Sequence, residues 1–100
     1  MKLITKEIAK QIEANPLYAH DGKDAKDVKV IAKFFNSWVG GTWYVTEGTK
    51  QEDCNIVFFG LCVMQDAELG YVTLSDLESI NVERDLYWEG TLADAQKEHK

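Results

Sequence analysis

The sequence has few of the residues that cross-link a small fold or interrupt its regular structure. It contains one proline, Pro16, and two cysteines, Cys54 and Cys62, among 100 residues. The cysteine spacing fits no zinc or redox motif, so we interpret both as reduced thiols that behave as small buried apolar residues. Hydrophobic residues at 45% and charged residues at 28% are typical of a globular chain and exclude a disordered one.

Long apolar segments are also missing. No run approaches the roughly 20 residues that a membrane-spanning helix needs, and the longest, 56–64, has the length of a strand. The segment 1–7 carries charged residues where the apolar core of a secretion signal would lie. We therefore expect a cytoplasmic protein with no membrane partner, built as a single domain over 1–100 in which 95–100 form a loose tail.

Positive charge is nearly absent from the second half of the chain. Residues 51–96 contain ten acidic residues and one basic residue, Arg84, whereas residues 1–50 contain eight lysines and six acidic residues. An acidic half repels phosphate, so we expect no direct binding to nucleic acid through it. The expected partner is instead a host protein with a basic surface.

The first regular element is predicted to be a helix over 3–14. Thr5 is a suitable N-cap, and three isoleucines recur every fourth residue to form one apolar stripe: Ile4, Ile8 and Ile12. The Asn-Pro pair that follows stops the helix, because a residue before proline avoids the helical region. The stripe is narrow, so we expect this helix to pack against a sheet.

Alternating and β-branched segments predict strands over 28–35, 42–46, 55–64 and 69–73, with a last edge strand over 84–88. In the first strand, four apolar side chains should share one face: Val28, Val30, Ala32 and Phe34. A hairpin loop over 36–41 and a polar loop over 47–53 separate the first three strands. Short loops between consecutive strands predict an antiparallel meander.

Two further helices are expected near the end of the chain. Ser75 and Glu78 match a capping box that would open a short helix through Ile80, and Thr91 could begin a frayed C-terminal helix. The predicted fold is therefore α+β, an antiparallel β-meander of four to five strands with an N-terminal helix and a short helix after the fourth strand. One helix before the meander and one after it should cover a single face.

Several blocks of sequence, in order along nearly the whole chain, resemble a known family. These are MKLITKE (1–7), KFF (33–35), TWYVTEG (42–48), FFGL (58–61), ELGYVTLSDLE (68–78) and ERDLYW (83–88). Together they are similar to the bacterial and phage family catalogued as domain of unknown function 2958. The departures are local: 37–41 is richer in glycine than is usual there, and Trp88 stands where phenylalanine is usual. The resemblance implies a protein of plasmids, phages or integrating elements, and no activity, catalytic residue or cofactor comes with it.

Exposed aromatic residues are the first candidates for a binding surface. Trp38, in a glycine-flanked loop, is the strongest candidate for an exposed anchor, because tryptophan is a typical hot-spot residue. Trp43 and Tyr44 must point to opposite faces of their strand, which would leave one of them on the outer face unless a helix covers it. For the aromatics as a group, Trp88 included, cross-strand packing is favoured over a binding surface.

Charged residues are the second group of candidates. Arg84 lies between Glu83 and Asp85, an arrangement that favours a structural ion-pair hub over a ligand-binding arginine. Acid–base catalysis or cation binding would need carboxylates that converge, and no spacing dictates that any two of them do, so solvated surface positions are the default. Nothing matches a nucleophile elbow, a phosphate-binding loop or a metal-binding histidine pair.

We therefore predict a small, acidic, non-enzymatic binding protein of a mobile element, without cofactor or bound metal. It would inhibit a host nucleic-acid-handling defence system, of anti-restriction or anti-CRISPR type, through an acidic, aromatic-bearing surface. The residues assigned to this surface are Trp38, Tyr44, Glu47, Glu68, Glu78, Glu83, Arg84, Asp85, Trp88 and Glu89. One alternative is a small-ligand-binding or minor enzymatic domain with a pocket around Arg84. The other is a homodimer or larger homo-oligomer that acts as a structural subunit, assembled through a sheet edge.

Overall fold

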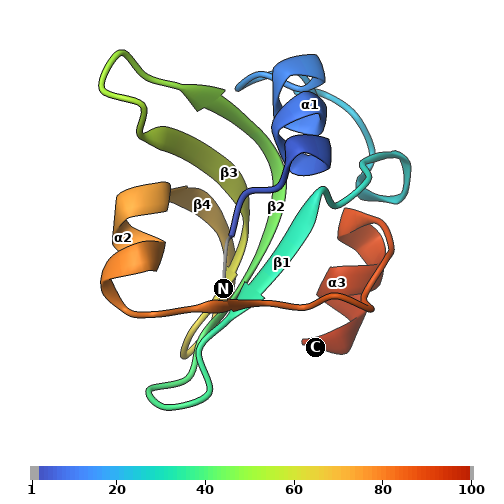
Figure 1. Ribbon diagram of the computed structural model, residues 1–100. Helices are drawn as coiled ribbons and strands as arrows, with labels where there is room; N and C mark the ends of the chain where they lie inside the picture. The colour runs from blue at the N-terminus through green and yellow to red at the C-terminus, as the bar shows by residue number, and fades with distance from the viewer. Residues whose placement is uncertain (1–2, 100) are drawn as a thin grey trace.

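A computed structural model describes residues 3–99 as one five-stranded antiparallel sheet with helices against both faces (Figure 1). The elements in chain order are α1 (Lys6–Ala14), the 3-10 turn η1 (Ala25–Asp27), β1 (Ala32–Phe35), β2 (Thr42–Lys50), β3 (Ile56–Val63), β4 (Ala67–Thr73), α2 (Leu74–Ser79), β5 (Glu83–Arg84) and α3 (Leu92–Glu98). Across the sheet the strand order is β4-β3-β2-β1-β5. The predicted α+β meander, with a helix before it and one after its fourth strand, is confirmed. No helix in the described part of the chain is long and apolar enough to cross a membrane.

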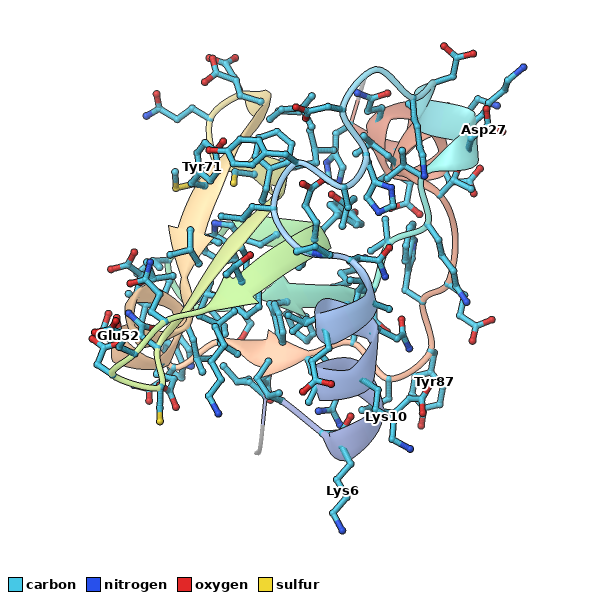
Figure 2. The ribbon with its side chains drawn as sticks, turned by 90° about the horizontal axis from the view of Figure 1, so that it is seen from above. Lys6, Lys10, Asp27, Glu52, Tyr71 and Tyr87 are labelled. Atoms are coloured by element: carbon cyan, nitrogen blue, oxygen red, sulfur yellow. The ribbon has the colours of Figure 1, made fainter. Side chains whose placement is uncertain are left out.

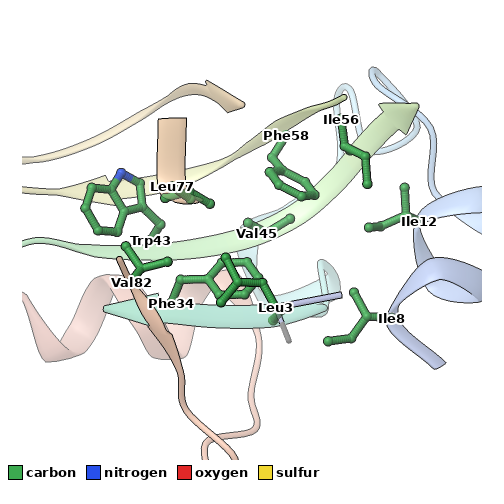
Figure 3. Packing of buried hydrophobic residues seen from close by; sticks show 11 residues of the cluster. Leu3, Ile8, Ile12, Phe34, Trp43, Val45, Ile56, Phe58, Leu77 and Val82 are labelled. Atoms are coloured by element: carbon green, nitrogen blue, oxygen red, sulfur yellow. The ribbon is translucent and has the colours of Figure 1, made fainter. Parts of the chain in front are cut away.

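Buried hydrophobic side chains form two clusters, one on each face of the sheet. The first, here called the α1–α2 cluster, extends from Ile12 of α1 to Trp43, which packs beside Leu77 of α2 (Figure 3). The second, here called the α3 cluster, has these buried members: Val28, Val30, Tyr44, Leu61, Leu92 and Ala95. Helices α1 and α2 thus share one face, as expected, whereas α3 covers the opposite face.

Helix α1 begins later than the expected residue 3. The Thr5 hydroxyl accepts a hydrogen bond from the Ile8 backbone N–H at 3.1 Å, which confirms Thr5 as the N-cap and leaves 3–5 outside the helix. Ile8 and Ile12 are buried in the α1–α2 cluster, as the apolar stripe predicted. The helix is therefore stabilised chiefly by packing against the sheet.

Strand β1 is half as long as predicted, because it starts at Ala32 rather than at Val28. Val28 and Val30 are buried, but in the α3 cluster, whereas Ala32 and Phe34 lie in the α1–α2 cluster on the other face. The expectation that all four share one face was wrong. A period of two holds only for continuous strand, and 28–31 is irregular apart from an isolated bridge between Lys29 and Thr91.

Strand β2 is longer than expected and replaces much of the predicted polar loop 47–53. It runs to Lys50 and pairs with β3 throughout, with a register shift between Val45 and Glu47 that marks a β-bulge. Of the predicted polar loop, only the part after Lys50 lies outside the strand, in the turn between β2 and β3. In this turn Cys54 is exposed and has a positive φ of 67°. The expectation that Cys54 is a buried apolar residue was therefore wrong.

The fourth strand and α2 are joined without a loop. The cap of α2 is Thr73 and not Ser75: the Thr73 hydroxyl accepts from the Asp76 N–H at 3.1 Å, and the Asp76 carboxylate accepts from the Thr73 N–H at 3.3 Å. The capping box is real but starts two residues earlier than predicted. Threonine serves this role as well as serine, so the pattern alone left two registers open.

The last strand and the C-terminal segment also differ from expectation. Strand β5 covers only Glu83–Arg84 and pairs with β1. It ends there because the Asp85 carboxylate accepts hydrogen bonds from the backbone N–H groups of Tyr87 and Trp88 and turns the chain away. Residues 95–98, for which we expected a loose tail, belong to α3, where Ala95 is fully buried. Lys100 lies outside the described residues.

The close approach of β2 to β3 at Gly60 gives a direct test of the fold. A Cβ atom at Gly60 would lie 1.9 Å from the Tyr44 carbonyl oxygen, so we expect Gly60→Ala to lower the free energy of unfolding by about 3 kcal/mol. Its cross-strand partner Gly70 provides the control, since a Cβ there would meet only the Cys62 sulfur at 4.0 Å. Urea unfolding followed by circular dichroism measures both variants, and equal stabilities would contradict this close contact between the strands.

Candidate binding groove

The described surface is hollowed on the α2 side of the sheet, and this hollow is the best candidate for a binding site. One cavity of about 740 Å³ lies between α2, the β3–β4 turn and the outer strands. A second, of about 480 Å³, lies between the 36–39 loop and the segment that follows α2. Ile80 lines both, so the two adjoin, and we call them together the α2 groove.

The lining of the α2 groove is strongly one-sided in charge. Four carboxylates line it: Asp66, Glu68, Asp76 and Glu83. Glu78 is exposed on α2 itself. None of the residues that line the two cavities is a lysine or an arginine. The groove therefore attracts cationic groups and repels anionic ones.

Beneath these acids the groove is apolar, because its floor is formed by Trp43 and Cys62, which belong to a cross-strand row that ends in Glu68. Trp43, Cys62 and Glu68 are paired neighbours across β2, β3 and β4 and so lie on the same face. Trp43 is buried, and burial raises the pKa of the Cys62 thiol, which keeps it protonated and unreactive at neutral pH. The expectation that Cys62 is a reduced, largely buried thiol fits this position.

Trp38 stands at the open end of the groove with 93% of its surface exposed. Its loop is held by Asn36, whose side-chain oxygen accepts hydrogen bonds from the Trp38 and Val39 N–H groups at 2.8 and 3.0 Å. The Asn36 amide also donates to the Ile80 carbonyl at the end of α2. The tryptophan is therefore presented on a fixed turn, as the prediction of an exposed anchor requires.

The structure divides the ten predicted surface residues into three groups. Trp38, Glu68 and Glu83 line the α2 groove, and Glu78 lies on its helix. A second group lines a separate cleft on the far side of β5: Arg84, Asp85, Trp88 and Glu89. The remaining two, Tyr44 and Glu47, are buried, so their assignment to a binding surface was wrong.

Tyr44 is 1% exposed because α3 covers its face of the sheet. Its hydroxyl donates a hydrogen bond to Glu98 at 2.8 Å and lies 2.7 Å from Nε2 of His99, while Trp88 Nε1 donates to the other Glu98 oxygen at 2.8 Å. Burial, and then the neighbouring Glu98, raises the pKa of Tyr44. The Tyr44 side chain therefore holds α3 on the sheet through its hydrogen bond to Glu98 and is not a surface residue.

Glu47 is 4% exposed because β2 continues through it instead of ending before it. Its carboxylate accepts a hydrogen bond from the backbone N–H of Tyr18, a residue with a positive φ of 72°. The next residue along β2, Gly48, donates from its own N–H to the Asn15 carbonyl at 3.0 Å. Glu47 therefore holds the connection after α1 against the sheet.

The cleft around Arg84, of about 330 Å³, has mixed charge. Arg84 donates from Nη1 to the Leu3 carbonyl at 3.1 Å, and Asp85 forms an ion pair with Lys33 at 3.6 Å. Backbone N–H donors, Tyr87 first, lower the pKa of Asp85, and Lys33 contributes to the same shift. Glu83 lines the α2 groove instead, so the predicted trio does not converge in one pocket.

Sequence reasoning left several contributors out of the predicted surface, among them Asn36, Asp76 and Ile80. Asn36 carries a turn signal, an asparagine two residues before the anchor, that we did not use. Asp76 lies between Ser75 and Glu78, in a segment that we interpreted only as the start of a helix. Across residues 3–99, no three histidine, cysteine or acidic side chains gather in a way that could hold a metal ion.

Comparison with known proteins gives one match. A family model described as "Protein of unknown function (DUF2958)" matches residues 3–95, which is nearly the whole chain. No curated protein and no solved structure matches the chain. The family description carries no activity, so the function has to be argued from the groove itself.

The contact between Glu98 and the sheet predicts a pH-dependent stability. Hydrogen bonds from Trp88 first, and then Tyr44, lower the pKa of Glu98 in the folded chain. The ionised carboxylate therefore stabilises the fold above its unfolded pKa of about 4.3, and this contribution is lost as the pH falls through the lower folded value. We expect Glu98→Gln to lower the thermal midpoint at neutral pH, by an amount that shrinks as the pH approaches about 3.

Thermal unfolding of wild type and Glu98→Gln across this pH range measures the effect. Glu52→Gln, which changes an exposed carboxylate of the β2–β3 loop, serves as the control and should follow the wild type. A Glu98→Gln deficit that is the same at every pH would show that the ionised carboxylate makes no specific contribution.

Proposed function

We propose that this chain, which belongs to the family described as protein of unknown function (DUF2958), is a small acidic binding protein whose α2 groove docks on a basic surface of another protein. The carrying observation is the combination in one groove of four lining carboxylates, an apolar floor and no lining cation. A site that binds only a small cation would need the carboxylates but no apolar floor. An apolar centre inside a polar, solvent-accessible rim is the usual arrangement of a protein-binding site.

The chemistry of the groove narrows the kind of partner. Phosphate is repelled by these acids, so nucleic acid itself does not fit. Proteins that bind nucleic acid carry the complementary basic surface, and a protein with an acidic groove can occupy that surface in place of the nucleic acid. The proposed action is therefore to block nucleic-acid binding by the partner, without catalysis.

The biological setting follows from the family resemblance. The resemblance implies a bacterial or phage protein of mobile elements, and we propose a cytoplasmic partner that belongs to a host defence system of the restriction or CRISPR type. Such systems act through proteins that bind nucleic acid, so a basic docking surface is available on them. Inhibition by competition with nucleic acid would serve the mobile element.

Reversal of the groove charges tests the proposal. The variant Asp66→Lys, Glu68→Lys, Glu83→Lys changes the formal charge from −6 by 3 × 2 units to 0. A matched control changes three exposed acids elsewhere by the same amount: Glu13→Lys, Asp24→Lys and Asp27→Lys. Asp27 lies on the opposite side of the molecule from β4 (Figure 2). The two variants therefore separate the groove from overall charge.

In a pull-down from host lysate, we expect the wild type and the control to capture the same basic protein. The groove variant should bind this protein at least about tenfold more weakly. The captured protein, once purified, should lose nucleic-acid binding when the wild type is added. Its affinity for the wild type should fall as salt rises from ~50 to ~300 mM, since salt screens the charges. Binding that ignores salt, or equal binding by all three chains, would contradict the proposal and direct attention to the Arg84 cleft as a small-ligand site.

The contribution of Trp38 gives a separate test of the same surface. Trp38→Ala should weaken binding to that partner by about 2 kcal/mol, the typical effect of removing a hot-spot aromatic residue. Tyr87→Ala is the matched control, because Tyr87 is 92% exposed, on a loop outside the α2 groove. Titration calorimetry on the purified pair distinguishes them. Equal losses for both variants would mean that Trp38 has no special role.

A further inference from the structure

Strand β4 forms one end of the sheet, and its outer side is available for pairing. Its inner side pairs with β3 in one unbroken register, and no strand within residues 3–99 pairs with its outer side. Natural edge strands are usually guarded by lysine, proline or a bulge. The seven residues of β4 include none of these and only one charge, Glu68.

Two large, mainly apolar side chains of β4 are exposed to solvent. Leu69 is 49% and Tyr71 is 56% exposed, and because they are two residues apart they lie on the same face. Figure 2 shows Tyr71 at the margin of the molecule, away from α3. Exposed apolar residues on an unguarded edge are the typical signature of strand addition.

Gly70 lies between these two residues, and packing within this chain leaves space for a side chain at its position. Its partner Gly60 has no space for a side chain, whereas a Cβ atom at Gly70 would make only an ordinary contact with Cys62. Glycine within a strand is destabilising by roughly 0.5–1 kcal/mol relative to alanine. It often marks a place where another backbone approaches closely.

We propose that β4 pairs with β4 of a second copy of this chain, antiparallel and centred on Gly70. In this register Leu69 lies opposite Tyr71 of the second copy, and Glu68 lies opposite its Val72. Each Leu69–Tyr71 pair joins exposed apolar surface on one face, and no like charges lie directly opposite each other. The pairing is thus self-complementary, and it joins two five-stranded sheets into one continuous sheet.

Salt distinguishes this association from docking at the α2 groove. Each copy carries a formal charge of −6, so two copies repel each other at long range, and added salt screens that repulsion. Dimerisation should therefore strengthen as salt rises, whereas binding to a basic partner should weaken. The dimer does not depend on the proposed function, because a chain without any basic partner would still pair.

A charge exchange across the predicted register provides the test. One variant carries Leu69→Glu and Tyr71→Glu, and the other carries Leu69→Lys and Tyr71→Lys. Each places like charges opposite each other in a dimer, so each should dimerise at least about tenfold more weakly than the wild type. An equimolar mixture places opposite charges together and should restore a dimer. Leu86→Glu with Tyr87→Glu is the matched control, because it makes the same chemical change at two exposed positions outside β4.

Sedimentation equilibrium measures the mass of each chain over a range of concentrations and at two salt levels, with circular dichroism as a check on folding. The proposal expects a wild-type dimer that strengthens with salt, two monomeric variants, a dimeric mixture and a control that behaves as the wild type. If the charged variants do not fold, Leu69→Ser with Tyr71→Ser removes the same apolar pairs without charge and should also weaken the dimer.

Three results would overturn the proposal. The first is a wild type that stays monomeric at high micromolar concentration in both salts. The second is a dimer that persists in a folded β4 variant, or is lost equally in the Leu86 and Tyr87 control, since its contact would then lie elsewhere. The third is a monomeric wild type whose capture of a basic partner depends on Leu69 and Tyr71, which would assign these two residues, both of which line the α2 groove, to the docking surface instead.

Discussion

Trp43 and Tyr44 point to opposite faces of β2, and each is a large buried residue of a different hydrophobic cluster. Both faces of this sheet are buried, so each side of its central strands has to be covered by helices. Helices α1 and α2 complete the face of Trp43, and α3 completes the face of Tyr44. The Tyr44 carbonyl also lies where any side chain at Gly60 would project, so the two central strands fit only with glycine there.

The same division of faces separates the charged residues into two environments. On the Trp43 side, the row that ends in Glu68 places a carboxylate above an apolar floor, and the acids of α2 and the β3–β4 turn join it. Around Arg84, lysines from the irregular segment 28–31 and from β1 balance the acids. Four acids of residues 51–96 thus line one groove that has no lining cation, whereas lysines balance the acids at the other cleft. This contrast favours the groove as the docking surface.

Local patterns predicted the meander, the first helix and the exposure of Trp38, because each depends on neighbours in sequence. They failed where distant contacts decide the outcome. Val28 and Val30 keep the alternation of a strand but turn toward α3. Glu47 has the sequence context of a loop residue but is buried because β2 continues through it, and its carboxylate accepts a hydrogen bond from the Tyr18 N–H. The groove was only partly predictable: acids and an aromatic anchor could be named, but their assembly depends on the strand register and on the place of α2.

The three tryptophans occupy three different settings: Trp38 is in solvent at the mouth of the groove, Trp43 is buried beneath it, and Trp88 is half-buried with its indole N–H on Glu98. Indole emission depends on the polarity around the ring, so the chain contains its own fluorescent reporters. Trp38 reports on what enters the groove, Trp43 on the core of one face, and Trp88 on the seating of α3. Single-tryptophan versions of the protein would let the opening of each face be followed separately.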